Sequence, residues 1–204
     1  MPSKLLVAAL LALGVMPAIS PAPAAAAGRC AHAAGATVLE TTARVAVYRT
    51  PGSQLGARIY ACWRPAGRTM LLHTNTGGAA VTDVIFDSRV AVSGRVVAFH
   101  VFASGDRNYD YVRSFDVRSG RGLRSSGIVQ RATGMLPQPP PPTAIATNAP
   151  GAILWLAGGV LRVTDGENTR AVATTAAGPI TGLRVTAGQA RWKQGGARHH
   201  NPLA

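Results

Sequence analysis

The chain has 204 residues and a formal net charge of +13, because 21 Lys and Arg face only eight Asp and Glu. This length fits one domain with a hydrophobic core. An excess of positive charge predicts salt-sensitive attraction to anionic polymers or lipids. The arginines are dispersed, and no recognition helix or zinc module is visible, so nucleic acid is the less favoured partner. A solvated charge surplus without function is the favoured interpretation of the excess itself, because a GC-rich genome also favours arginine, and a surface-binding role is the alternative.

The N-terminus has the three-part layout of a secretory signal peptide. Lys4 gives the positive region, Leu5–Met16 the apolar run, and Pro17–Ala27 the helix breakers and small residues. The apolar run is too short to cross a bilayer. We therefore predict that residues 1–27 are a cleaved signal peptide and that the protein is secreted and extracellular, with no later transmembrane span. An uncleaved anchor is the alternative.

The two cysteines, Cys30 and Cys62, allow one intramolecular pairing. In an exported chain a structural disulfide is favoured over free thiols. A catalytic cysteine is the weaker interpretation, since only His32 lies nearby and its spacing matches no catalytic motif.

Beyond the signal peptide, short apolar runs alternate with Gly- and Pro-rich turns, and no window has helical periodicity. This pattern predicts an all-β fold: a propeller-like array of short antiparallel sheets, or alternatively a β-sandwich or irregular barrel. The expected strands are 44–48, 57–63, 68–73, 81–86, 89–92, 95–102, 109–117, 153–156, 160–164, 169–173, 183–186 and 190–193.

We expect one domain over residues 28–198. Its Pro-rich segment, residues 134–143, cannot join a sheet and is predicted to be a surface loop. Residues 199–204 are predicted to form a disordered tail.

A weak internal repeat favours the propeller-like alternative. Aromatic residues occur late in apolar runs at intervals of about 40 residues once the Pro-rich interruption is subtracted, the size of one propeller blade. Two segments, 92–99 and 185–192, also share a leading Val, an internal Gly and a final aromatic residue. The four aromatic residues are Tyr60, Phe99, Trp155 and Trp192.

The segment Val112–Arg121 resembles the strand–Asp–turn–Gly–Arg hairpin of many β-propeller repeats. Together with Arg44–Arg68 and Leu183–Gly196, it is similar to segments of secreted, uncharacterised actinobacterial proteins with propeller-like repeats. The resemblance implies a Cys-bridged first blade, a central hairpin and a Trp-containing final hairpin. It implies no activity.

The best metal candidate is the oxygen-rich segment Asp106, Asn108 and Asp110, whose alternating side chains suit a hard cation such as Ca²⁺. The calcium-loop pattern also needs Gly at its sixth position and Glu at its twelfth, where this chain has Tyr111 and Val117. The match is therefore half a motif, and a polar hairpin tip is the favoured alternative. No other cofactor is expected.

Anion-binding candidates are Arg118, Arg121 and Arg124, because no acidic residue occurs between Asp116 and Asp165. Further cations near the C-terminus follow the last acidic residue: Arg184, Arg191, Lys193 and Arg198.

Nucleophile elbows, zinc spacings and other local catalytic signatures are missing, so no catalytic residue is assigned. The predicted function is a secreted non-catalytic module that binds the anionic cell envelope or an exported partner protein. The alternative is a small secreted hydrolase with dispersed acidic residues. Its candidates are Asp83, Asp87, Asp116, Asp165 and Glu167.

Overall fold

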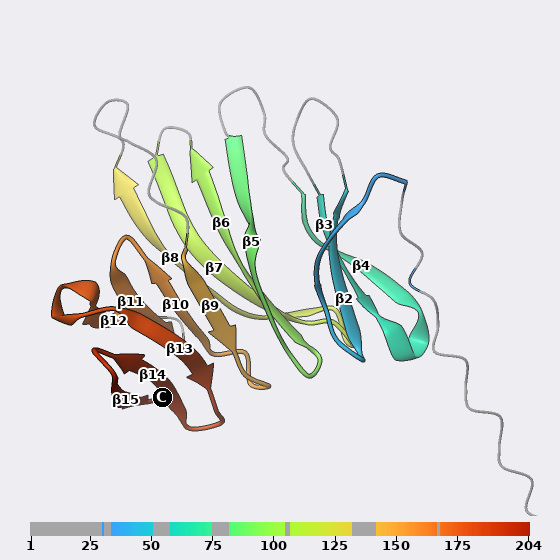
Figure 1. Ribbon diagram of the computed structural model, residues 1–204. Coiled ribbons are helices and arrows are strands. Elements are labelled where there is room, and N and C mark those ends of the chain that lie inside the picture. Colours follow the sequence, from blue (N-terminus) through green and yellow to red (C-terminus); the bar gives the residue numbers. More distant parts are fainter. Residues whose placement is uncertain are drawn as a thin grey trace, which may run out of the picture.

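A computed structural model describes residues 30, 34–50, 58–74, 82–104, 107–131, 142–166 and 168–204, with the backbone alone at 74, 82–88, 101–104, 107–110 and 126–131. The predicted signal peptide, residues 1–27, and most of the Pro-rich segment lie outside this part. The described residues form four antiparallel sheets, and in each sheet strands that follow one another along the chain lie side by side (Figure 1).

The first sheet contains β1 (Thr37–Thr41), β2 (Val45–Thr50), β3 (Arg58–Trp63) and β4 (Arg68–Thr74), with the short helix η1 (Arg64–Ala66) before β4. The second contains β5 (Thr82–Ser93), β6 (Val96–Ser104), β7 (Arg107–Asp116) and β8 (Arg121–Arg131). The third contains β9 (Ala144–Thr147), β10 (Ile153–Ala157), β11 (Val160–Thr164) and β12 (Thr169–Thr174), followed by the short helix η2 (Thr175–Ala177). The fourth contains β13 (Ile180–Val185), β14 (Gln189–Gln194) and β15 (Ala197–Pro202).

The predicted all-β, propeller-like array is confirmed. Among the described strands, none of the four sheets closes into a barrel. Each sheet contains one of the repeated aromatic residues: Tyr60 in β3, Phe99 in β6, Trp155 in β10 and Trp192 in β14. The similar segments 92–99 and 185–192 span the hairpins β5–β6 and β13–β14, so one repeat corresponds to one sheet.

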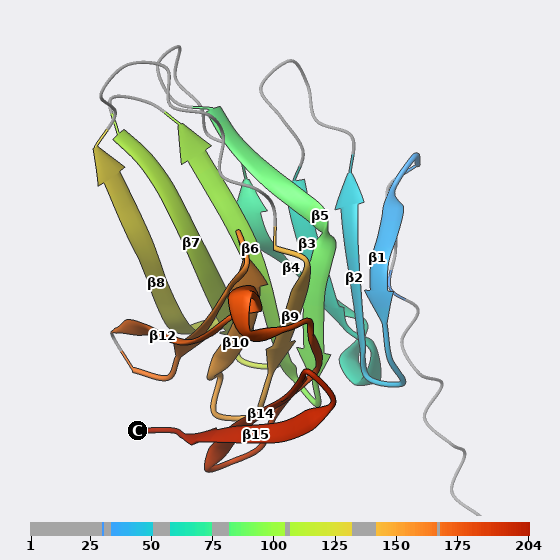
Figure 2. The ribbon, with the colours of Figure 1, turned by 60° about the vertical axis from the view of Figure 1, so that its left-hand side comes forward.

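The sheets follow one another in space in chain order. The first strand of each sheet contacts the first strand of the next, in the pairs β1–β5, β5–β9 and β9–β13. The first sheet and the fourth sheet lie at different ends of the array in both views (Figure 1 and Figure 2). The described strands thus form an open series, in which the first and fourth sheets each have one face turned away from the other sheets.

A hydrophobic core lies between each pair of consecutive sheets. The core between the first and second sheets includes Val47, Ile59 and Phe99. The core between the second and third includes Ala98 and Trp155. Because neighbouring residues of a strand point to opposite faces, both faces of the second sheet are buried here.

The strand β10 shows the same two-sided burial in the third sheet. Ile153 and Trp155 pack toward the second sheet, whereas Leu154 and Leu156 pack toward the fourth. A strand buried on both faces appears in sequence as a continuous apolar run, as Ile153–Ala157 does.

The predicted disordered tail at residues 199–204 is wrong. Its residues 199–202 belong to β15, which pairs with β14 along the whole of that strand. The segment lacks an apolar run, so sequence pattern gave no strand signal. Its order comes from backbone pairing and from contacts with the third sheet.

The predicted disulfide joins Cys30 to Cys62, with their Cα atoms 5.8 Å apart. Cys62 is fully buried in β3. The bond therefore fastens the chain ahead of β1 to the third strand of the first sheet. In the part of the chain described, no helix has the length and apolar character that a membrane span requires.

Replacing both cysteines with Ser is expected to lower the free energy of unfolding by about 3–4 kcal/mol, because the closed loop restricts the unfolded chain. Urea denaturation of the oxidised protein and of the variant measures this. Reductant should destabilise the original protein and leave the variant unchanged; equal stability of the two would contradict the prediction.

Two neighbouring residues in β10 test the packing of both faces. Ile153→Ala and Leu154→Ala should each cost about 2–5 kcal/mol, since both side chains are fully buried in different cores. The control Leu71→Ala, at a side chain 46% exposed, should cost well under about 1 kcal/mol. A small effect at either β10 position in denaturant unfolding would contradict this packing.

Candidate anion-binding surface

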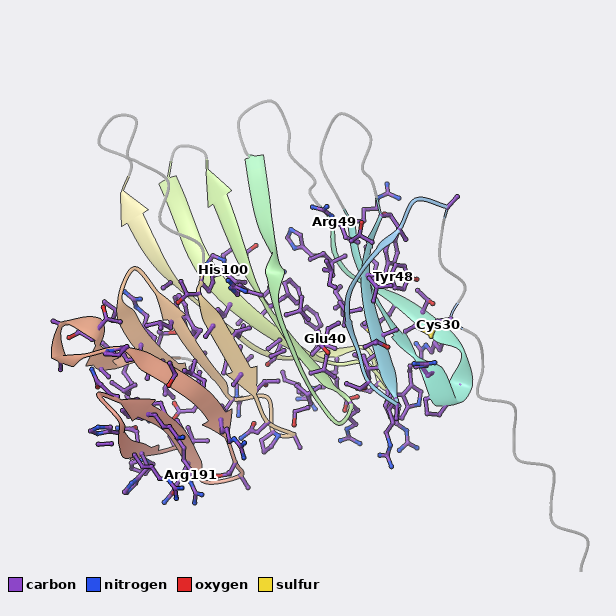
Figure 3. All side chains as sticks on the ribbon, viewed as in Figure 1. Cys30, Glu40, Tyr48, Arg49, His100 and Arg191 are labelled. Atoms are coloured by element: carbon purple, nitrogen blue, oxygen red, sulfur yellow. A yellow bond between two sulfur atoms is a disulfide. The ribbon has the colours of Figure 1, made fainter. Side chains whose placement is uncertain are left out.

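The fourth sheet has one buried face and one exposed face. In β14, Ala190 and Trp192 are buried against the third sheet, whereas the alternate residues Arg191 and Lys193 are exposed. This alternation is the pattern of a half-buried strand. Figure 3 shows Arg191 on the side of the fourth sheet that is turned away from the other sheets.

Strand register gathers further positive side chains around these two. Arg191 lies directly between Arg184 of β13 and His200 of β15. Lys193 pairs with Arg198 of β15. All five side chains are exposed, and cross-strand partners share a face of the sheet. We call Arg184, Arg191, Lys193, Arg198 and His200 the cationic face.

The cationic face has an unfavourable arrangement of charge. Arg184 stands directly opposite Arg191, and Lys193 stands directly opposite Arg198. Like charges at such positions repel and destabilise a sheet. Residues 178–204 contain no Asp or Glu, so the sheet supplies no carboxylate to compensate. An anion bound across the two pairs would relieve this repulsion.

Neighbouring residues position Arg191 and Lys193, the two cations of the central strand. The Nε atom of Arg191 donates a hydrogen bond to Oε1 of Gln189, 3.1 Å away, which orients the guanidinium along the strand. A β-bulge in β13 places Gly182 beside Lys193, where an added Cβ would lie 3.8 Å from Cγ of the lysine. Gly182 has φ +62°, a conformation that favours glycine.

A set of contacts fixes β15 to the third sheet. Nη1 of Arg170 binds both carboxylate oxygens of Asp165, at 2.7 and 2.8 Å. Nη2 of Arg170 donates to Oδ1 of Asn201 at 2.9 Å and to the carbonyl of Pro202 at 2.7 Å. The backbone N–H of Ala204 donates to Oδ2 of Asp165 at 2.9 Å. These contacts, which we call the C-terminal latch, hold the strand that carries Arg198 and His200.

The latch also shifts the pKa of Asp165. Burial of this carboxyl raises its pKa, but the hydrogen bonds from Arg170 and Ala204 and the charge of Arg170 outweigh burial, so the pKa lies below its ordinary value. Asp165 is therefore held as a carboxylate and occupied by structural contacts.

The structure does not bring the predicted anion-binding arginines together on one face. Arg118 and Arg121 are exposed at the turn between β7 and β8, close to Asp116, whose carboxylate accepts the backbone N–H of Arg118 at 2.9 Å. Arg124 is half-buried in β8, opposite Ser114. Asp116 itself forms a 2.7 Å ion pair with Arg95, so negative charge accompanies this turn.

The predicted calcium segment is partly a strand. Asp106 lies outside the described residues, whereas Asn108 and Asp110 lie in β7 and pair through the backbone with Gln130 and Ile128. The strand predicted over residues 109–117 begins two residues earlier in the structure, at Arg107, so Asn108 belongs to a strand. Among the residues described, no group of three His, Cys, Asp or Glu is placed to hold a metal ion.

The described hydrolase candidates have structural roles. Asp116 pairs with Arg95, and Asp165 pairs with Arg170. Asp83 and Asp87 belong to β5, where only the backbone is described, and Glu167 lies outside the described residues. His100 is fully buried in β6, with its ring 5.9 Å from that of Trp155.

The sequence shows the C-terminal cations Arg184, Arg191, Lys193 and Arg198 as an excess of charge, but this excess alone does not identify a site. The alternation of Ala190, Arg191, Trp192 and Lys193 could have placed Arg191 and Lys193 on one exposed face. Their cross-strand partners required the register of β13 and β15.

Neither a protein-family model nor a curated protein matches the chain. The geometry of the described residues is thus the basis for a functional proposal.

Asp165→Asn should destabilise the protein at pH 7 by about 1.5–3 kcal/mol, because Arg170 loses its charged hydrogen-bond partner. The lowered folded pKa means that the stability from Asp165 is complete above the unfolded pKa, about 3.9, and is lost as pH falls through the folded value. Urea unfolding between pH 2 and 7 measures this. The variant should lose less stability on acidification, and identical pH profiles would contradict the assignment.

Proposed function

We propose that this protein is a secreted, non-catalytic module that binds an anionic polymer, of the cell envelope or of an exported partner, through the cationic face. One observation carries the proposal: four Arg and Lys residues share the exposed face of a sheet in which like charges stand directly opposite each other. An anion bound between these side chains would offset the repulsion.

The position of the face supports binding to a large partner. The fourth sheet is the last of the open array, and no other described sheet covers its outer side (Figure 2). An extended polymer can therefore lie along the cationic face without entering a cavity. Exposed cations on a flat surface attract polyanions at a distance, and this attraction weakens with ionic strength.

The signal-peptide pattern supports the location of this partner outside the cell. The disulfide between Cys30 and Cys62 is compatible with an oxidising compartment. An envelope polymer with repeated negative charge is the partner that meets both the compartment and the chemistry of the face.

The proposal predicts that Arg191→Glu/Lys193→Glu weakens retention on isolated cell envelopes at low salt by at least about tenfold in apparent affinity, since two attractive contacts become repulsive. The matched control is Arg118→Glu/Arg121→Glu, which makes the same change in net charge at the β7–β8 turn. Retention is measured by co-sedimentation across a salt gradient.

The control variant should keep most of its binding. Equal losses in the two variants would mean that net charge alone drives retention. Binding of the original protein that does not fall with salt, or no binding at all, would overturn the proposed function.

A further inference from the structure

We infer that the anionic ligand of the cationic face is a linear phosphodiester polymer without bases, a poly(polyol phosphate), which this face recognises two consecutive phosphates at a time. This inference rests on the proposed function and specifies its ligand class. It starts from the arrangement of the four Arg and Lys side chains in two cross-strand pairs.

Each pair is suited to one phosphate. Arg184 and Arg191 are directly opposite on neighbouring strands, as are Lys193 and Arg198. Residues in this relation have Cβ atoms about 5 Å apart, so both side chains of a pair can reach the same group. A guanidinium binds two phosphate oxygens at once through its fork of N–H donors, and each pair contains at least one arginine.

The distance between the two pairs is close to the repeat of such a polymer. Arg191 and Lys193 are two residues apart in β14, which is about 7 Å along the strand. Their partners lie on opposite neighbours of β14, so the centres of the pairs are also offset by one interstrand spacing and are about 8 Å apart. In a phosphodiester chain with a three-carbon linker, six single bonds of about 1.5 Å separate successive phosphorus atoms and extend over roughly 7 Å. The long side chains can lean over the remaining distance of about 1 Å, so consecutive phosphates can occupy both pairs together.

The same spacing occurs in nucleic acids, but the cationic face carries no Phe, Tyr or Trp on which bases could stack, and its one ring is the imidazole of His200. Proteins that bind single-stranded nucleic acid use exposed aromatic side chains on which bases stack. In the fourth sheet, Trp192 is only 5% exposed and belongs to the buried face. Its ring stacks on His199, at a centroid distance of 5.8 Å. The outward-facing positions of β14 hold Gln189, Arg191 and Lys193, none of which has an aromatic ring.

Binding of purified oligo(glycerol phosphate) with one, two or six phosphates to the oxidised protein tests the inference. The two-phosphate compound should bind at least about tenfold more tightly than the one-phosphate compound, because the second contact is intramolecular. The logarithm of its binding constant should fall linearly with the logarithm of the salt concentration. The expected slope is about −1.4, because each neutralised phosphate of a single strand contributes about −0.7.

Two variants separate the contributions of the pairs. Arg184→Gln/Arg191→Gln and Lys193→Gln/Arg198→Gln each remove one pair at exposed positions, and each should reduce the slope to about −0.7. In either variant the two-phosphate compound should bind no better than the one-phosphate compound. An unchanged slope or an unchanged preference for two phosphates in both variants would overturn the inference.

Two further ligands decide the class of polymer. Poly-glutamate of equal charge and oligothymidylate with equal phosphate number should both bind at least about fivefold more weakly than the six-phosphate compound. Equal or tighter binding of poly-glutamate would show a general polyanion surface, and tighter binding of oligothymidylate would show recognition of nucleic acid. A general polyanion surface overturns this inference and leaves the proposed function standing, whereas recognition of nucleic acid, or failure to bind any of the polymers, overturns both.

Discussion

The packing of apolar side chains on both faces of the second and third sheets is the constraint on which this structure depends. Trp155 is fully buried on one side of β10, and its neighbours Leu154 and Leu156 are buried on the other. Small antiparallel sheets of this kind gain little stability alone, because each leaves an apolar face in water. Stacking four of them in series removes most of these faces from water at once.

The open series has two end sheets, and their outward faces differ in packing and charge. On the first sheet, the outward-facing Tyr48 is almost fully buried and stacks on Tyr60, while the buried Cys62 holds the disulfide. On the fourth sheet, the outward face is mainly polar and charged. The first end is therefore strengthened by packing and a covalent bond, whereas the second keeps a solvated plane of like charges that is available to a ligand.

The cationic face depends on the third sheet even though it faces away from it. Trp192 and Ala190 pack into the core between the two sheets and set which residues of β14 turn outward. Arg170 and Asp165 then hold the end of β15, so that Arg198 and His200 stay in register with their partners. Core packing and a partly buried ion pair thus hold in place a surface whose like charges repel each other.

The sequence by itself determined the secondary structure class, the disulfide and the repeat. Alternating apolar runs and turn residues predict strands because side chains in a strand point to alternate faces. Two cysteines allow one bond, and Tyr60, Phe99, Trp155 and Trp192 recur at intervals near 40 residues once the Pro-rich segment is subtracted. These features are local, or depend on so few residues that alternatives are scarce.

Only the tertiary structure decided where the charges meet. Arg184, Arg191 and His200 come from three strands, and their alignment depends on the bulge at Gly182 and on the pairing of β15, a segment whose sequence predicts disorder. Arg118, Arg121 and Arg124 are closer in sequence, yet a turn and a half-buried position separate them. Charge in a sequence fixes how strongly a protein attracts anions, but cross-strand register decides which charges act on the same group, because register joins residues that the chain keeps apart.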